Sequence, residues 1–141
     1  MIGLARVEVI GEGGSMSGDS LKAKSHKDLQ VWQRAMSLVV SLYGLLRSFP
    51  ADERFGLVDQ IKRSAISIPS NIAEGAARQT SREYIQFLYI AAGSAAELDT
   101  QLILAQRFGF STEIETQLEE LQIVRKQLNV MITKLRANHE K

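Results

Sequence analysis

The chain contains no cysteine, which excludes disulfide bonds, thiolate nucleophiles and thiolate metal ligands. Its only histidines are His26 and His139, which lie near the two ends of the chain, and neither follows a glutamate by three residues. A di-metal centre inside a helical bundle requires such Glu-x-x-His pairs. We therefore expect no bound metal and no cofactor.

Groups arranged for catalysis are scarce as well. There is no serine in a glycine-flanked elbow of the kind that hydrolases use. Glu97 and Asp99 are two residues apart, so on a helix they point to different sides and do not form an acid–base pair. The sequence predicts no catalytic residue, and we expect a protein that is not an enzyme.

An excess of one charge is also missing. The net charge is +1, from 17 basic and 16 acidic residues, so the chain as a whole is not attracted to nucleic acid. No apolar run approaches the roughly 20 residues that cross a bilayer, and the first residues do not resemble a signal peptide. We expect a cytoplasmic protein without membrane contact, in which any nucleic-acid binding comes from a local patch.

Apolar residues at helical spacing are abundant. Intervals of three and four predict helices over about residues 27–48, 52–76, 81–107 and 111–138. The connections are short, so we predict an all-α fold, an antiparallel up-down-up-down four-helix bundle over residues 26–138. Residues 1–25, rich in glycine and serine, are predicted to form a flexible tail. Thr80 and Glu83 form a capping box for the third helix, and Ser111 is predicted to cap the fourth.

The first predicted helix carries two apolar stripes, whereas a helix at the edge of a bundle needs one. One stripe consists of Leu29, Trp32, Met36, Val39, Tyr43 and Leu46. The other contains the residues that we predict to form an oligomer interface, which are Val31, Ala35, Leu38, Leu42 and Leu45. The alternative is that the first helix is buried more deeply within its own bundle.

The segment QIKRSAISIPSNIAEG, residues 60–75, combines an apolar stripe with a polar stripe on one helix. Pro69 predicts a kink there, and Gly75 is predicted to end the helix in the left-handed conformation. Asn71 and Glu74 of this segment are expected to meet Glu97 and Gln101 of the next helix. We interpret these four residues as a structural polar network, with a ligand pocket as the alternative.

Four basic residues lie in or beside the same segment. Lys62, Arg63, Arg78 and Arg82 are the candidate nucleic-acid-binding residues, because arginine and lysine bind phosphates and an oligomer repeats them in each copy. The alternative is a solvated face with local ion pairs. The run AAGSAA, residues 91–96, consists of small residues that allow another helix to approach closely.

The chain resembles the four-helix-bundle family of 23S rRNA intervening-sequence proteins, which includes the accessory variability determinants of diversity-generating retroelements. The resemblance is carried by DLQVWQRA (28–35), FPADERFGLVDQ (49–60), QIKRSAISIPSNIAEG (60–75), SREYIQFLYIAAGSAAELDTQL (81–102) and AQRFGF (105–110). It implies assembly into homopentameric rings and, by likeness to the retroelement members, binding of nucleic acid and a reverse transcriptase through basic surfaces. The near-neutral charge departs from that subgroup, whose members are basic.

From these observations we expect a homo-oligomeric bundle that binds RNA or DNA through a ring of basic residues. The resemblance implies five copies. The alternative function is a scaffold or adaptor that binds a partner protein and no nucleic acid.

Overall fold

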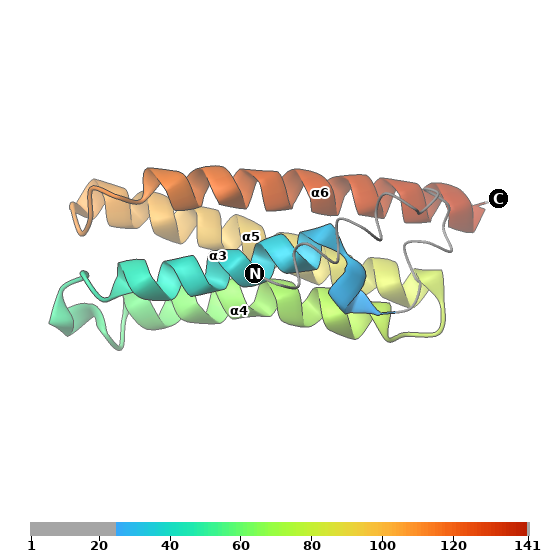
Figure 1. Cartoon of the computed structure of the whole chain (residues 1–141), viewed down its shortest axis with the longest axis horizontal. Coiled ribbons are helices and arrows are strands. Elements are labelled where there is room, and N and C mark those ends of the chain that lie inside the picture. Colours follow the sequence, from blue (N-terminus) through green and yellow to red (C-terminus); the bar gives the residue numbers. More distant parts are fainter. Residues whose placement is uncertain (1–24, 141) are drawn as a thin grey trace.

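The computed structural model of the protein describes residues 25–140. Its α-helices are α3 (Gln30–Leu46), α4 (Leu57–Ala76), α5 (Ser81–Phe108) and α6 (Glu115–Glu140), and the short 3-10 helices are η1 (His26–Asp28) and η2 (Ala51–Glu53). No strand occurs in these residues, and the four long helices lie alongside one another as a bundle (Figure 1). The predicted all-α four-helix bundle is confirmed. The predicted tail, residues 1–25, lies outside the described residues except for Ser25, whose hydroxyl caps η1.

Contacts between neighbouring helices run in opposite chain directions. On α4 and α5, Ser67 meets Ser94, while Gly75, further along α4, packs against Tyr84, which is earlier on α5. The same reversal relates α5 to α6, as shown by the pairs Tyr89–Arg136, Asp99–Gln122 and Gln106–Glu115. The fourth helix, α6, returns beside α3, where Gln117 donates a hydrogen bond to Ser41.

The core lies along the bundle axis and draws one apolar stripe from each helix. Because the residues at spacings of three and four share a face, each stripe turns inward as a unit. Large side chains that are fully buried include Leu42, Ile61, Ile68, Ile72, Leu88, Leu98, Leu102, Leu121, Leu128 and Leu135. Each contributes about 1.5–3 kcal/mol relative to an exposed side chain.

The predicted oligomer interface on the first helix is wrong in its choice of stripe. Val31, Ala35, Leu38, Leu42 and Leu45 are buried in the chain's own core, so a second copy cannot reach them. Two stripes on one helix compete for the inward position, and this one packs more completely against the other helices. The flanking stripe is left partly outside: Trp32 and Val39 are half-buried, whereas Met36 and Tyr43 are exposed.

The helix starts in the structure agree with the sequence prediction at Thr80, where a side chain caps the helix, and differ from it at the second and fourth helices. The N-cap half of the capping box is confirmed, since the Thr80 hydroxyl accepts a hydrogen bond from the Glu83 N–H at 3.2 Å. The Glu83 carboxylate accepts from the same hydroxyl at 3.1 Å, not from the Thr80 N–H. The second helix begins at Leu57, later than predicted, because residues 51–53 form η2. The fourth begins at Glu115, so the prediction that Ser111 caps it is wrong; the Ser111 hydroxyl accepts from the Glu113 N–H within the preceding loop.

Gly75 does not end α4 in the left-handed conformation, so that prediction is wrong. It is a helical residue, and the only positive φ in the described chain belongs to Gly109, at 76°, which ends α5. A Cβ on Gly75 would lie 2.8 Å from the Phe87 Cβ and 3.2 Å from the Tyr84 carbonyl oxygen. Glycine is therefore needed for the close approach of α5. Pro69 is buried inside α4, and the kink there stays a prediction.

Candidate nucleic-acid interface

The basic residues predicted to bind nucleic acid do not form one patch. Lys62 and Arg63 lie near the start of α4, whereas Arg78 follows its end, fifteen residues after Arg63. At a rise of 1.5 Å per residue, this separates Arg63 and Arg78 by about 22 Å along the bundle. The set divides into one pair on the first part of α4 and one pair at the α4–α5 connection.

The pair on α4 is largely occupied by local contacts. The Arg63 Nε donates to the Asp59 carboxylate at 3.2 Å, one helical turn earlier. The Lys62 Nζ lies 4.8 Å from the centre of the Tyr43 ring on α3, a cation–π contact between neighbouring helices. Both arrangements fit the alternative of a solvated face with local pairing.

The second pair flanks the connection between α4 and α5. Arg78 donates to the Glu74 carboxylate at 3.0 Å, and its guanidinium carbon lies 4.7 Å from the centre of the Phe87 ring. Arg82, in the first turn of α5, is exposed and makes no ion pair with any residue that the structure describes. This end of the bundle therefore keeps a cation that no described carboxylate neutralises.

Two further residues, Arg136 and Tyr89, meet at this end of the bundle. Arg136, in the last part of α6, donates from Nη1 to the Tyr89 hydroxyl on α5 at 2.9 Å. Tyr89 follows Arg82 by seven residues, which places both on nearly the same face of α5. The spacing of Arg82 and Tyr89 was visible in the sequence, but the register that brings Arg136 beside them was not.

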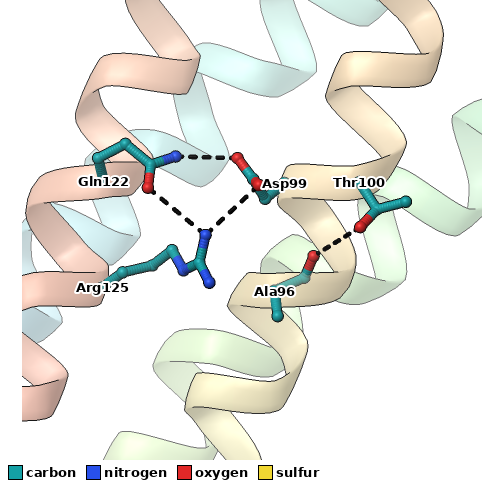
Figure 2. A network of polar contacts seen from close by, with 5 residues as sticks. All are labelled: Ala96, Asp99, Thr100, Gln122 and Arg125. Atoms are coloured by element: carbon teal, nitrogen blue, oxygen red, sulfur yellow. Dashed lines mark hydrogen bonds and ion pairs between the residues drawn. The ribbon is translucent and has the colours of Figure 1, made fainter.

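Further along the α5–α6 contact, charge is balanced within the bundle. Figure 2 shows the Asp99 carboxylate accepting from the Gln122 amide at 2.9 Å and pairing with Arg125 at 3.4 Å. Arg125 also donates to the Gln122 carbonyl at 3.4 Å, which closes a triangle between the two helices. Arg125 is thus paired with a carboxylate, unlike Arg82.

The predicted polar network does not form as one unit. The Asn71 amide donates to the Ser67 carbonyl and hydroxyl oxygens at 2.8 and 2.9 Å, and the Ser67 and Ser94 hydroxyls are 2.7 Å apart. Glu74 is exposed and pairs with Arg78 instead. The α4–α5 contact is thus bridged by the Ser67–Ser94 pair, because short side chains fit where the helices are close, and Asn71 supports Ser67 from one turn along α4.

The other two residues of that predicted network, Glu97 and Gln101, differ in burial. Glu97 is exposed on the outer side of α5, whereas Gln101 is buried with 6% exposure. The Gln101 side-chain oxygen has no hydrogen-bond partner among the described residues. Neither contacts Asn71 or Glu74 through a hydrogen bond in this part of the chain.

Two structural findings bear on other kinds of site. Across residues 25–140, no three or more histidine, aspartate or glutamate side chains come together in a way that could hold a metal ion. No helix in that range combines the length and apolar character that crossing a membrane requires.

Comparison with known proteins gives a family match and similar solved structures. Residues 27–134 match the family model described as 23S rRNA-intervening sequence protein. A crystal structure of a protein of unknown function from the S23 ribosomal protein family of Bacteroides thetaiotaomicron has the same fold, with a TM-score of 0.67 and 28% sequence identity. The similarity covers 72% of this chain and 97% of that one. No curated protein matches the sequence.

Proposed function

Since the chain belongs to the family of 23S rRNA-intervening sequence proteins, we propose that it is a non-enzymatic homo-oligomer that binds RNA in the cytoplasm. Contact is made by Arg78 and Arg82 at the α4–α5 connection, together with Arg136. The resemblance to ring-forming relatives supports five copies. It also supports a relation to retroelement accessory proteins, while the net charge of +1 argues against their reverse-transcriptase partner.

The observation that carries RNA binding is the unneutralised charge at this end of the bundle. Arg82 has no described carboxylate partner, and Arg136 bonds to a neutral hydroxyl rather than to an acid. The Arg78–Glu74 pair is exposed, and such pairs are worth about 0–1 kcal/mol, so a phosphate can compete with Glu74. Repetition of three arginines in each copy then gives an affinity that depends on salt.

Assembly is supported by an exposed apolar strip on α3 and α4. The strip consists of Met36, Val40 and Tyr43 on α3 and Ile66 on α4, all of them exposed. Lys62 over Tyr43 fixes the register, and Ile66 follows Lys62 by one turn, so the two helices bring these side chains together. An apolar strip of this kind is what a second copy would cover.

The test is binding of a labelled structured RNA across a salt series, with the oligomer mass recorded in the same buffers. The double variant Arg78→Glu and Arg82→Glu should weaken binding and flatten the dependence of log K on log salt, by about 0.7–0.9 for each phosphate that is no longer neutralised. Arg63→Glu is the matched control, because it reverses another exposed arginine that pairs one turn away. It should leave binding unchanged.

Three outcomes separate the possibilities. Weaker binding in the double variant with an unchanged mass supports the site. A loss of log K in Arg63→Glu that is half the loss in the double variant would show a diffuse charge effect, because the control reverses one charge instead of two. Unchanged binding in both variants would contradict RNA contact at this end.

A protein-binding scaffold is the second candidate function, and the outer face of α5 favours it. Ile90, Leu104 and Phe108 are exposed there, away from the strip on α3 and α4. A partner protein captured with the same yield before and after nuclease treatment, by a chain that binds no RNA at low salt, would support the scaffold over the RNA-binding protein.

A further inference from the structure

We propose that Tyr89 is a stacking surface for an unpaired RNA base, held in place by Arg136, with Arg82 binding a phosphate of the same strand. This inference rests on the proposed RNA binding and narrows it to single-stranded or looped RNA. It is carried by the position of an exposed tyrosine between two arginines that no described carboxylate neutralises.

The Tyr89 ring is accessible and its position is fixed. Its exposure is 48%, which is high for a large aromatic side chain on a bundle helix. The hydrogen bond of 2.9 Å from Arg136 joins the hydroxyl end of the ring to α6, while its Cβ end is fixed to α5. A ring held at both ends loses little freedom when a base stacks on it, and loss of side-chain freedom is one of the costs of binding.

Arg82 lies at a distance from Tyr89 that suits a phosphate of the strand whose base stacks on the ring. Arg82 precedes Tyr89 by seven residues on nearly the same face of α5, which is about 10 Å at the helical rise. Gln86, between them, is exposed and uncharged. A strand that places a base on Tyr89 can therefore bring a phosphate to Arg82 without passing a carboxylate of α5.

The neighbouring carboxylates are already engaged. Glu83, in the first turn of α5, accepts hydrogen bonds through the capping box with Thr80. Glu74 pairs with Arg78 on the other side of the connection. The face that carries Arg82, Tyr89 and Arg136 thus attracts an anion.

An unpaired base is the ligand that fits this arrangement. In duplex RNA both faces of each base are covered by the stack, and the deep major groove of an A-form helix does not admit side chains. In single strands and loops the bases can be splayed out onto aromatic rings and arginine planes. A stacking ring beside two cations is thus matched to single-stranded RNA more than to duplex.

Tyr43 provides a comparison, because it is an exposed tyrosine whose ring face is already covered by a cation. Its exposure is 37%, but the Lys62 Nζ lies 4.8 Å from its ring centre and covers one face. Arg136 contacts Tyr89 at the hydroxyl, at the edge of the ring. The cation beside Tyr43 therefore covers a face of the ring, whereas the cation beside Tyr89 contacts the hydroxyl at the ring edge. Tyr89 also has a second arginine, Arg82, nearby.

The experiment compares a single-stranded RNA oligonucleotide with a blunt duplex of the same sequence. Tyr89→Ala should lose roughly 5- to 100-fold in affinity for the single strand, the range for one base stack, and change duplex binding less than twofold. Tyr89→Phe, which keeps the ring and loses the bond to Arg136, should retain most of the affinity. Phe108→Ala is the matched control, since it removes an exposed aromatic from the opposite end of the same helix.

A second readout reports stacking directly. A 2-aminopurine base in the oligonucleotide should lose fluorescence on binding to the native protein and to Tyr89→Phe, but not to Tyr89→Ala. The salt dependence should be the same for Tyr89→Ala as for the native chain, because both neutralise the same phosphates. Thermal unfolding of each variant shows whether the bundle is intact.

The outcomes distinguish this inference from the function on which it rests. If Tyr89→Ala binds the single strand as the native chain does, while Arg78→Glu with Arg82→Glu weakens binding, stacking is overturned and RNA binding stands. An equal reduction for single strand and duplex in Tyr89→Ala would also overturn stacking. A native chain that binds neither RNA at low salt overturns both proposals.

Discussion

The two sides of α5 pack against their neighbours in different ways. On the α4 side the helices are close, with Gly75 against Phe87 and the hydroxyls of Ser67 and Ser94 2.7 Å apart. On the α6 side, long polar side chains span the rim above buried leucines, as Asp99 does with its two partners (Figure 2). The first contact depends on shape and has no room for an added atom at Gly75, whereas the second rests on buried leucines, with hydrogen bonds at its exposed rim that water can replace.

This difference also separates the groups that hold the bundle together from the groups that are exposed to a ligand. The buried groups on the α4 side, Gly75 and the Ser67–Ser94 pair, are committed to packing, so a ligand cannot use them without separating the helices. The rim between α5 and α6 presents polar groups to solvent, and Tyr89 with Arg136 belongs to that rim. The proposed stacking site therefore lies on the side of α5 where polar groups are exposed.

The largest effect is expected from Gly75→Ala on the close side. The new Cβ would meet the Phe87 Cβ at 2.8 Å and the Tyr84 carbonyl oxygen at 3.2 Å, and neither is the end of a flexible side chain. Overpacking costs about 1–3 kcal/mol, and contact with a Cβ and a backbone oxygen, which cannot swing aside, places this site in the upper part of that range, at about 2–3 kcal/mol. The helix propensity of alanine returns about 1 kcal/mol. We expect a net destabilisation of about 1–2 kcal/mol in urea unfolding at fixed protein concentration. A variant as stable as the native chain would show that α4 and α5 separate easily.

A pH-dependent effect should follow from Tyr84, which lies on the same close side. Its side chain is buried, and burial raises the pKa of its hydroxyl because the phenolate would be desolvated. The folded state keeps the proton while the unfolded chain releases it above about pH 10, so folding stability should fall as the pH rises beyond that value. The slope for this group approaches about 1.4 kcal/mol per pH unit.

A phenylalanine variant tests this origin. Tyr84→Phe should show a flatter loss of stability between about pH 10 and 12 than the native chain. Identical curves for the native chain and Tyr84→Phe would contradict the assignment.

Gly93→Ala should have an effect of the opposite sign. Gly93 is exposed in the middle of α5, and no atom lies within 4 Å of the position that its Cβ would take. Alanine should therefore stabilise the helix by about 0.5–1 kcal/mol, measured under the same conditions as Gly75→Ala. Destabilisation instead would show that another chain approaches α5 closely at this point.

The sequence predicts the helices better than it predicts their mutual register. Apolar spacing and the Thr80–Glu83 capping box identify the bundle, because both depend on residues close together in the chain. Gly75 was misread because a glycine that ends a helix and a glycine that admits a neighbouring helix look the same in one sequence. The structure separates them through φ and through the distance to Phe87.

The candidate site was predicted only in part for the same reason. Arg78 and Arg82 were identified by their closeness in sequence, whereas Arg136 joins them through the α5–α6 register. Lys62 and Arg63 share a segment with Arg78 but lie about 22 Å away along the helix. The two apolar stripes of α3 predicted that one would be left outside, but which one depends on how the other three helices pack.

The smallest effect is expected from Asp99→Asn on the α6 side. The variant removes the charge that pairs with Arg125 at 3.4 Å and keeps an oxygen that can accept from Gln122 (Figure 2). Because both side chains are partly exposed, the loss should be below about 1 kcal/mol, and it should shrink further in about 1 M salt, where screening reduces the pair. Thr100→Ala is the control, since Thr100 donates only to the Ala96 carbonyl of its own helix and should show no salt dependence. If Asp99→Asn costs more than Gly75→Ala, α5 and α6 are held together by charge rather than by their leucines, and the contrast between the two sides of α5 is wrong.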